Sequence, residues 1–534
     1  MNNLFSNYNY DIIIIGGGIT GVFLTYKLAE TGLKIILFET ENKLGGRINT
    51  IKENNIQYEA GAARIHISHS KVLTLIDELG LSNDKYKLPE KIDTILRTNK
   101  NETSSYNTSI NLNLKELLNK SYEISKSLKK EELLNISYEQ YLSNIYDFET
   151  SQFIKHSFGY DSEFESMNAY TALLMFKDDF FKNDDYYGLK GGLSQIINTM
   201  ENKLNEKPNV IIKLNCSIKE IANKHIITDK NTKFTFNYLI STIPSNKLKN
   251  IDFFNDKLEL LKSVKSIPLL RIYLKYNEVW FRNIIRTTTD NNLRHIIPID
   301  YDNGLIMLSY TDGKYATMWN NCHSNGDDYL IEQLHKQIYD LYKINPPKPE
   351  AIYIHYWNSG FHTWLPGYNS ENISNLIMKP HEDKEIYICG ESYSMKQGWI
   401  EGSLETAFKV IKMLPLDGFK VVTDKEVDSS ETKEDTVEKE LSLEQVLNEE
   451  GWIIMDIDGS KKANVYDVSE WIPTHPGGQI IKEGIKNNNY YKNNKGKSPI
   501  ELFKQYHSDT VIEKHLINME NPLIKKVGVV LIDK

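Results

Sequence analysis

The stretch that decides the fold is YDIIIIGGGITG, which spans residues 10–21. Its β-branched run from Tyr10 to Ile15 is typical of a buried parallel strand. The run ends in a G-x-G-x-x-G turn, and an amphipathic helix is expected over about residues 20–31. A strand, a glycine turn and a helix in this order predict a Rossmann-like unit that binds a dinucleotide around Gly16, Gly18 and Gly21.

Each glycine of this turn has its own physical task. Gly16 makes the tight turn, Gly18 lets the backbone approach a pyrophosphate, and Gly21 lets the helix lie close to the strand. The helix N-terminus presents free N–H groups and a positive dipole to the phosphates. A second strand is expected over residues 34–38 and ends at Glu39, a carboxylate suited to binding a ribose hydroxyl. The alternative is a glycine-rich turn in a plain βαβ unit.

The residues that follow Glu39 favour FAD over NAD. Residues 43–50, KLGGRINT, resemble the GG-R-x-x-T signature of the flavin-containing amine oxidoreductases. This family includes monoamine, polyamine and L-amino-acid oxidases. The resemblance implies that Gly46 and Arg47 hold the pyrophosphate and the ribityl chain of FAD.

Two later segments are similar to the same family. Residues 59–65, EAGAARI, resemble a stretch that passes close to the isoalloxazine, which implies cofactor contacts from Ala63 and Arg64. A strand is expected over residues 210–218. The resemblance implies that its end near Ile218 gives backbone contacts to the adenine.

The last part of the resemblance is a C-terminal FAD motif. It consists of residues 386–391, IYICGE, and residues 398–405, GWIEGSLE. The motif implies that Gly390 and Glu391 contact the ribityl or phosphate region. A helix that begins near Ile400 would direct its N-terminus at the pyrimidine end of the flavin, where its dipole would stabilise the negative charge of the reduced form.

These motifs predict an α/β protein with a Rossmann-like FAD-binding domain of the glutathione-reductase type. We expect this domain to comprise residues 1–82, 188–260 and 365–415. Between its segments we expect an α+β substrate domain, interleaved in the sequence, from residues 83–187 and 261–364.

The family's chemistry implies the reaction and the residues around the substrate. A hydride would pass from a C–H bond next to an amine to flavin N5, and the resulting imine would hydrolyse. Arg64 lies where L-amino-acid oxidases place an arginine that binds the substrate carboxylate. Trp399 is predicted to form one wall of the substrate site, with Trp364 as a candidate for the second; His362 and Tyr368 are alternatives. The alternative for Arg64 is a flavin-facing or structural arginine, and the alternative for Trp399 is core packing.

Two departures from the family pattern bear on mechanism. The family usually has a lysine, bridged by water to flavin N5, where this chain has Arg271; a different register would make Lys275 or Lys265 the counterpart. Members that bind flavin covalently have a cysteine in a region where this chain has none between Cys322 and Cys389. The FAD is therefore predicted to be non-covalent.

The C-terminal part resembles another family. Residues 465–471, VYDVSEW, and residues 475–478, HPGG, are similar to cytochrome b5. The resemblance implies an α+β domain that binds haem b between two histidines, His475 and His507, with His515 as the alternative to the second ligand. Two imidazoles would give a haem that carries one electron and leaves no open coordination position.

An acidic segment precedes this domain. Residues 416–440 are expected to form a flexible linker, because residues 424–440 contain eight acidic residues, three lysines and no aromatic residue. The cytochrome b5-like domain is expected over residues 441–534.

Composition excludes several classes of function. The 534 residues carry a net charge of −9, which argues against a nucleic-acid partner. The N-terminus has no signal-peptide pattern, and apolar runs are too short to span a bilayer. Three well-separated cysteines favour a reducing compartment. We therefore expect a soluble cytoplasmic protein with no membrane partner.

The leading hypothesis is an FAD-dependent oxidoreductase that oxidises an amine or amino acid and passes electrons to its haem, to O2 or to an external redox protein. A desaturase or porphyrinogen-oxidase-like flavoprotein is one alternative, because such proteins share the FAD motifs. A non-catalytic electron-transfer protein is another.

Overall fold

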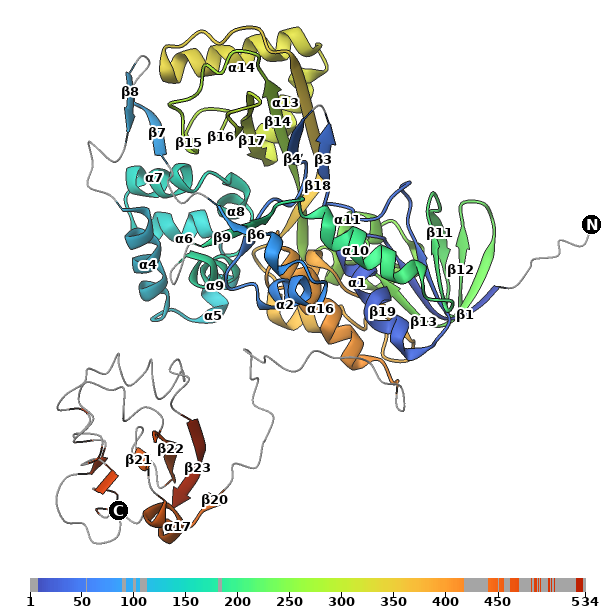
Figure 1. Cartoon of the computed structure of the whole chain (residues 1–534), viewed down its shortest axis with the longest axis vertical. Helices are drawn as coiled ribbons and strands as arrows, with labels where there is room; N and C mark the ends of the chain where they lie inside the picture. Colours follow the sequence, from blue (N-terminus) through green and yellow to red (C-terminus); the bar gives the residue numbers. More distant parts are fainter. Residues whose placement is uncertain are drawn as a thin grey trace, which may run out of the picture. The chain divides into compact units, whose positions relative to one another are not determined.

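The computed structural model describes most of the chain in two compact units, residues 1–425 and 426–534 (Figure 1). In the first unit it describes residues 8–53, 55–88, 93–98, 102–105, 113–180 and 185–416. In the second it describes residues 440–449, 451–455, 462–469 and 525–531, with the single positions 482, 485, 486, 488, 490, 498, 499, 501 and 504.

The first unit is built on a parallel sheet around β1 (Tyr8–Ile15). Its parallel strands lie in the order β10 (Val210–Lys213), β2 (Ile35–Phe38), β1, β13 (Lys233–Ser241) and β19 (Ile386–Ile388). Both faces of β1 are covered, because Ile12 and Ile14 belong to one apolar cluster and Ile13 and Ile15 to another. This explains why the strand is a continuous apolar run.

Helices cover one face of this sheet. Helix α1 (Ile19–Leu28) contacts α10 (Ser194–Asn205) and α16 (Ile400–Met413), and α16 also contacts α2 (Ser70–Glu78). Each supplies residues to the apolar cluster that contains Ile12. Helix α1 is shorter than the expected helix over residues 20–31, and its last turn is a 3₁₀ turn over Ala29–Thr31.

The prediction of a single strand over residues 210–218 was wrong, because two strands occupy this region. β10 ends at Lys213, and β11 (Ile218–Ile221) pairs with β12 (His225–Thr228) beyond β13. Asn215 breaks the extended chain with a φ of 51°. The N–H groups of Asn215 and Cys216 donate to the carbonyls of Glu41 and Glu39, so the segment between the strands passes the end of β2.

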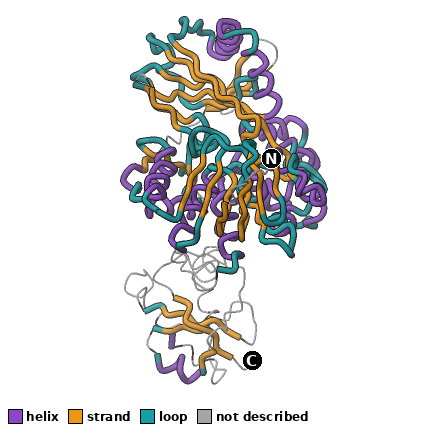
Figure 2. Tube along the Cα trace, turned by 90° about the vertical axis from the view of Figure 1, so that its right-hand side faces the viewer, coloured by secondary structure: helices purple, strands orange, loops and turns teal. Residues whose placement is uncertain are grey.

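A second seven-stranded sheet lies in the same unit, and Figure 2 shows the two sheets as separate groups of strands. The long antiparallel pair β14 (Val264–Lys275) and β18 (Ala351–Trp364) forms one side of this second sheet, with β18 as the edge strand. The remaining strands are β17 (Leu305–Asp312), β16 (His295–Asp300), β15 (Thr287–Thr289), β7 (Asp93–Thr98) and β8 (Glu102–Ser105). Helices α13 (Gly313–His323) and α14 (Asp327–Tyr342) contribute to an apolar core with these strands.

A group of helices has its own aromatic core, with Tyr138, Phe164 and Phe176 at its centre. These helices are α4 (Leu114–Ser125), α5 (Lys130–Leu134), α6 (Tyr138–Ile145), α7 (Phe148–Phe158), α8 (Asp161–Glu165) and α9 (Ala169–Phe180) (Figure 1). Two small sheets complete the unit: β3 (Thr50–Glu53) with β4 (Ile56–Glu59), and β5 (Ile65–His66) with β9 (Tyr186–Leu189) and β6 (Lys85–Lys87).

The second unit has a four-stranded sheet. The strand order is β20 (Glu440–Leu441), β23 (Lys525–Leu531), β22 (Lys462–Asp467) and β21 (Trp452–Met455). Helix α17 (Leu443–Asn448) begins at a capping box of Ser442 and Gln445. His475 and His507 lie outside the described residues, as does most of the expected linker. No helix in the described parts of either unit is long and apolar enough to cross a membrane.

Two glycines of the β1–α1 turn allow a matched test of the packing. A Cβ on Gly21 would lie 1.9 Å from the carbonyl oxygen of Gly16, whereas a Cβ on Gly18 would meet no atom within 4 Å. We expect Gly21→Ala to destabilise the cofactor-free protein by on the order of 1–3 kcal/mol, since the helix must move away from the strand. Gly18→Ala is the control and should melt within about a degree of wild type in a thermal unfolding scan. Equal melting temperatures for both variants would contradict this account.

Candidate functional site

Solvent-accessible glycine backbone lies at the N-terminus of α1. Gly16, Gly18 and Gly46 are partly exposed although the strands and helices around them are buried. Gly46 has a φ of 54°, and a Cβ there would lie 3.3 Å from the Cα of Gly18. The first turn of α1 has no side-chain cap and no acidic residue. Free N–H groups, a positive dipole and side-chain-free backbone fit the pyrophosphate of FAD.

Glu39 lies at the end of β2 beside this glycine backbone. Its carboxylate accepts hydrogen bonds from the N–H groups of Gly17 at 2.5 Å and of Glu41 at 2.8 Å. Ile218 opens β11 two residues after Cys216, whose N–H donates to the Glu39 carbonyl. The structure thus brings Glu39 next to the glycine turn, and the chain leading to Ile218 next to Glu39.

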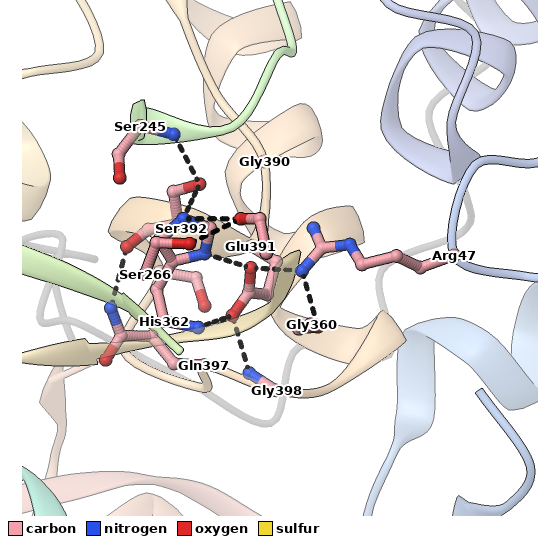
Figure 3. A network of polar contacts seen from close by, with 12 residues as sticks. Arg47, Ser245, Ser266, Gly360, His362, Gly390, Glu391, Ser392, Gln397 and Gly398 are labelled. Atoms are coloured by element: carbon pink, nitrogen blue, oxygen red, sulfur yellow. Dashed lines mark hydrogen bonds and ion pairs between the residues drawn. The ribbon is translucent and has the colours of Figure 1, made fainter. Parts of the chain in front are cut away.

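The buried carboxylate of Glu391 is the centre of a polar network (Figure 3). Its Oε2 accepts from Arg47 Nη1 at 2.8 Å and from His362 Nδ1 at 2.7 Å. Its Oε1 accepts from the N–H groups of His362 at 2.8 Å and Gly398 at 2.9 Å. Because an ionised carboxylate only accepts hydrogen bonds, Nδ1 of His362 carries the proton. Arg47 Nη1 also donates to the carbonyl of Gly360 at 3.0 Å.

The charge of Glu391 is strongly favoured. Burial by itself would raise the pKa of this carboxyl, but the positive charge of Arg47 and the interactions with His362 outweigh burial and hold the pKa well below its usual range. Glu391 is therefore ionised throughout the physiological pH range. Sequence reasoning expected Glu391 to contact the cofactor, and it missed that His362 and Gly398 already bind both oxygens.

Helix α16 begins at Ile400, where the sequence motif predicts it. Trp399 is the N-cap residue and makes no side-chain cap. Glu401 in the first turn binds elsewhere, since its carboxylate accepts from the N–H groups of Lys71 and Val72 at the start of α2, each at 3.0 Å. The first N–H groups of α16 therefore have no carboxylate partner from Glu401.

Arg64 lies in an aromatic enclosure formed by Tyr186 and Trp399. The guanidinium carbon is 4.7 Å from the Tyr186 ring centroid and 5.5 Å from that of Trp399. The two rings stack at 6.2 Å with an interplanar angle of 17°. Tyr186 reaches this position because β9 pairs with β5, which follows Arg64 directly. Sequence reasoning missed Tyr186 because no local motif marks it.

Arg271 is a second arginine near the same tyrosines, and we refer to Arg64 and Arg271 as the arginine cluster. It pairs across β14 and β17 with Tyr310, and its guanidinium carbon is 4.3 Å from that ring centroid. Its Nη1 donates to the carbonyl of Glu59 at 2.8 Å. Neither lysine alternative lies here: Lys275 forms an ion pair with Glu350 at 2.7 Å, and Lys265 is exposed, with Nζ 3.4 Å from Ser166 Oγ.

Side chains of the large sheet donate hydrogen bonds to the segment over residues 59–63. Tyr273, on the same face of β14 as Arg271, donates to the Glu59 carbonyl at 2.6 Å, and Trp357 donates to the Ala60 carbonyl at 2.8 Å. Ala63 is the last residue of this segment and is partly exposed. The segment expected to pass the isoalloxazine is thus held in place by three side chains of β14 and β18.

Trp364 is not part of this cluster. Its side chain is fully buried in the apolar cluster beneath the parallel sheet, and its Nε1 donates to the Ser394 carbonyl at 2.9 Å. This position fits core packing. The structure places Tyr186, Tyr160 and Tyr310 around Arg64 and Arg271 instead.

Other candidate groups have ordinary surroundings. Cys216, Cys322 and Cys389 are free thiols, and burial raises the pKa of Cys389 far above its usual range. Among the described residues, no group of three or more histidine, cysteine, aspartate or glutamate side chains is arranged to hold a metal ion.

Comparisons with known proteins agree with the fold. The chain is 23% identical over 471 residues to an uncharacterized protein of Acanthamoeba polyphaga mimivirus, covering 74% of this chain and 92% of the relative. It is 22% identical over 513 residues to aplysianin-A of Aplysia kurodai, covering 75% and 89%. Amine oxidase [flavin-containing] B of Rattus norvegicus matches at 32% identity over 83 residues, which is 15% of this chain and 16% of that protein.

A solved structure of wild-type putrescine oxidase bound to putrescine has the same fold. Its TM-score is 0.61 at 15% identity, and the match covers 76% of this chain and 99% of that chain. The family model described as "Flavin containing amine oxidoreductase" matches residues 19–410. This range begins within the glycine turn and includes the Glu391 network and the arginine cluster. The chain therefore belongs to the flavin-containing amine oxidoreductase family and is an FAD-dependent oxidoreductase.

Proposed function

We propose that this enzyme oxidises an amino acid at the carbon that bears its amine, and that Arg64 binds the substrate carboxylate. One observation carries the proposal. The Arg64 guanidinium lies beside two stacked aromatic rings and forms no hydrogen bond with any residue that the structure describes. A partly buried guanidinium without an acceptor is suited to a carboxylate ligand, which it can bind through two parallel hydrogen bonds.

The surroundings of Arg64 support a site next to the flavin. Trp399 forms its wall and is also the N-cap of α16, the helix that the family motif directs at the flavin. FAD, when bound, supplies the hydride acceptor. The residues of this chain would exclude water with the aromatic rings and orient the substrate through its carboxylate.

The cofactor would be held by residues from several segments. We assign the pyrophosphate to the open backbone at Gly16, Gly18, Gly21 and Gly46, and the ribose to Glu39. Ile218, Ala63, Gly390 and Ile400 would contribute as the family motifs imply, and the FAD would be non-covalent. Glu391 would act through Arg47, because its own oxygens are occupied while the Arg47 side chain remains 31% exposed.

The replacement of the usual lysine has a chemical consequence. A guanidinium cannot lose its proton at physiological pH, and Arg271 is also fixed by Tyr310 and the Glu59 carbonyl. We propose that Arg271 provides a fixed positive charge beside the flavin and holds the segment at Glu59. This departs from oxygen-driven members, so the electron acceptor is proposed to be the attached haem, with O2 or an external redox protein as the other acceptors.

The haem proposal rests on the sequence of the second unit. HPGG at residues 475–478 and the histidine at 507 match the cytochrome b5 pattern, and we propose His475 and His507 as the two ligands of haem b. The expected linker over residues 416–440 would keep haem and flavin in one molecule, so that electron transfer between them would be intramolecular. The domain boundaries expected from the sequence are likewise proposed on the basis of the family motifs.

Anaerobic titration of the purified full chain tests the function. Bleaching of the flavin by amino acids supports the proposal, and subsequent haem reduction under nitrogen supports internal transfer. Peroxide release in air would instead identify O2 as the acceptor. If amino acids and simple amines leave the flavin oxidised, the proposal fails in favour of a desaturase or porphyrinogen-oxidase-like activity.

Arg64→Ala should raise KM for amino acids by about tenfold to a hundredfold, because a charged hydrogen-bonded contact contributes about 1.5–3 kcal/mol. KM for a simple amine such as putrescine should change little. Steady-state kinetics with both substrates checks this, and Arg282→Ala, at an exposed position, is the control. A similar rise in KM for both substrates would contradict a carboxylate-binding role.

Glu391→Gln should lower the free energy of unfolding by about 3 kcal/mol at pH 7, because Arg47 and His362 lose a buried charged partner. The folded-state pKa is depressed, so this stabilisation is present above about pH 4.5 and is lost as the pH falls through the folded-state value. Thermal unfolding from pH 7 to pH 3 should therefore show a smaller loss of stability for the variant than for wild type. Parallel curves would refute the argument; Glu278→Gln, at an exposed position, is the control.

His475→Ala should abolish the Soret band of the purified full chain while leaving the flavin absorption intact. His515→Ala should keep the Soret band. Absorption spectroscopy of both variants is the measurement. A haem spectrum that survives His475→Ala would rule out the proposed ligand.

A further inference from the structure

A third arginine approaches the cluster around Arg64. Arg286 directly precedes β15 and is half-buried, and its Nε is buried without a hydrogen-bond partner. Its guanidinium forms no hydrogen bond or ion pair with any residue in the described parts of the chain. Arg64 and Arg286 are therefore two guanidiniums of one cluster that have no acceptor from the protein there.

The three arginines face the same tyrosines. Tyr160 and Tyr310 lie close enough to interact with the charges of Arg64, Arg271 and Arg286. Burial, and then the positive charge of Arg64, lower the pKa of Arg286 to about 10. The cations thus repel one another in a partly desolvated region, and an anionic ligand would reduce this repulsion.

Nearby acidic groups do not neutralise the cluster. The carboxylate of Glu59 accepts hydrogen bonds from Thr50 and from the N–H of Leu193. Asp161 forms a 2.7 Å ion pair with Arg294. Neither carboxylate forms an ion pair with Arg64 or Arg286, although Glu59 interacts electrostatically with Arg271.

The neighbouring histidine is neutral and leaves the charge of the arginines unchanged. His295 lies across β16 and β17 from Tyr310, and its ring is 4.6 Å from that of Tyr160. Burial and the surrounding arginines hold the pKa of His295 well below its usual range, so the ring is neutral. Its Nε2 is buried without a hydrogen-bond partner, as are the Nε atoms of Arg271 and Arg286.

We propose that Arg286, supported by Arg271, binds a second carboxylate and that the substrate is an amino acid with an acidic side chain. This inference rests on the proposed function, since Arg64 binds the first carboxylate. Arg64 then orients the amine end next to the flavin, and Arg286 selects the side chain. A substrate with a single carboxylate would neutralise only one of the two guanidiniums, Arg64 or Arg286, and would leave the other unbalanced.

Kinetics with matched substrates test the selection. In wild type, kcat/KM for L-glutamate or L-aspartate should exceed that for the corresponding amide, L-glutamine or L-asparagine, by at least about tenfold. Arg286→Gln should lower kcat/KM for the acidic substrates by about tenfold to a hundredfold and leave the amides nearly unchanged. Arg286→Lys should retain part of the preference, and Arg282→Gln, at an exposed position, should retain all of it.

Binding of an unreactive dicarboxylate gives an independent measurement. Glutarate should raise the melting temperature of the wild-type holoenzyme more than butyrate does, and Arg286→Gln should remove this difference. The inference is overturned if glutarate and butyrate act alike, or if Arg286→Gln weakens glutamate and glutamine oxidation equally. If neutral amino acids bleach the flavin and acidic ones do not, the amino-acid function stands while this inference fails. If no amine or amino acid bleaches it, the proposed function fails, and the glutarate shift still reports on the anion site.

Discussion

The interaction on which the rest of the site depends is the buried contact between Glu391 and its partners. It joins three segments that are far apart in the chain: Arg47 after β2, His362 in β18, and Gly398 before α16. A buried carboxylate is costly unless its oxygens are satisfied, and here four donors satisfy them. The positions of helix α16 and of the long β14–β18 pair are therefore linked through one side chain.

Much of the nucleotide-binding part could be predicted from the sequence, because its signals are local. The apolar run into Gly16, the glycine spacing up to Gly21 and the start of α16 at Ile400 each lie within a few residues. The prediction of one strand over residues 210–218 failed because of a single residue. Asn215 adopts a left-handed conformation and divides the expected strand, and no periodicity argument marks such a position.

The arginine cluster could not be found in this way. Arg64 was selected from a family motif, but Tyr186 meets it only because β9 pairs with β5, and Tyr310 meets Arg271 only because β17 pairs with β14. Both contacts join residues that are far apart in the sequence, and strand pairing decides them. Trp364 shows the opposite case, since an aromatic residue in a plausible motif region is buried in the core. Pattern alone does not distinguish a substrate wall from packing.

The three hydrogen bonds to the carbonyls of Glu59 and Ala60 limit how the enzyme can move. Arg271, Tyr273 and Trp357 all reach this short segment from the large sheet. A hinge motion that separated the large sheet from residues 59–60 would break the three bonds together, at about 1 kcal/mol or more for each. The large sheet and the segment at residues 59–60 should therefore move as one body. The helical group α4–α9 is tied to the large sheet as well, through the ion pair of Asp161 with Arg294 and the hydrogen bond from the Asn168 N–H to the Trp364 carbonyl. We therefore expect substrate entry to depend on side-chain motion rather than on separation of these layers.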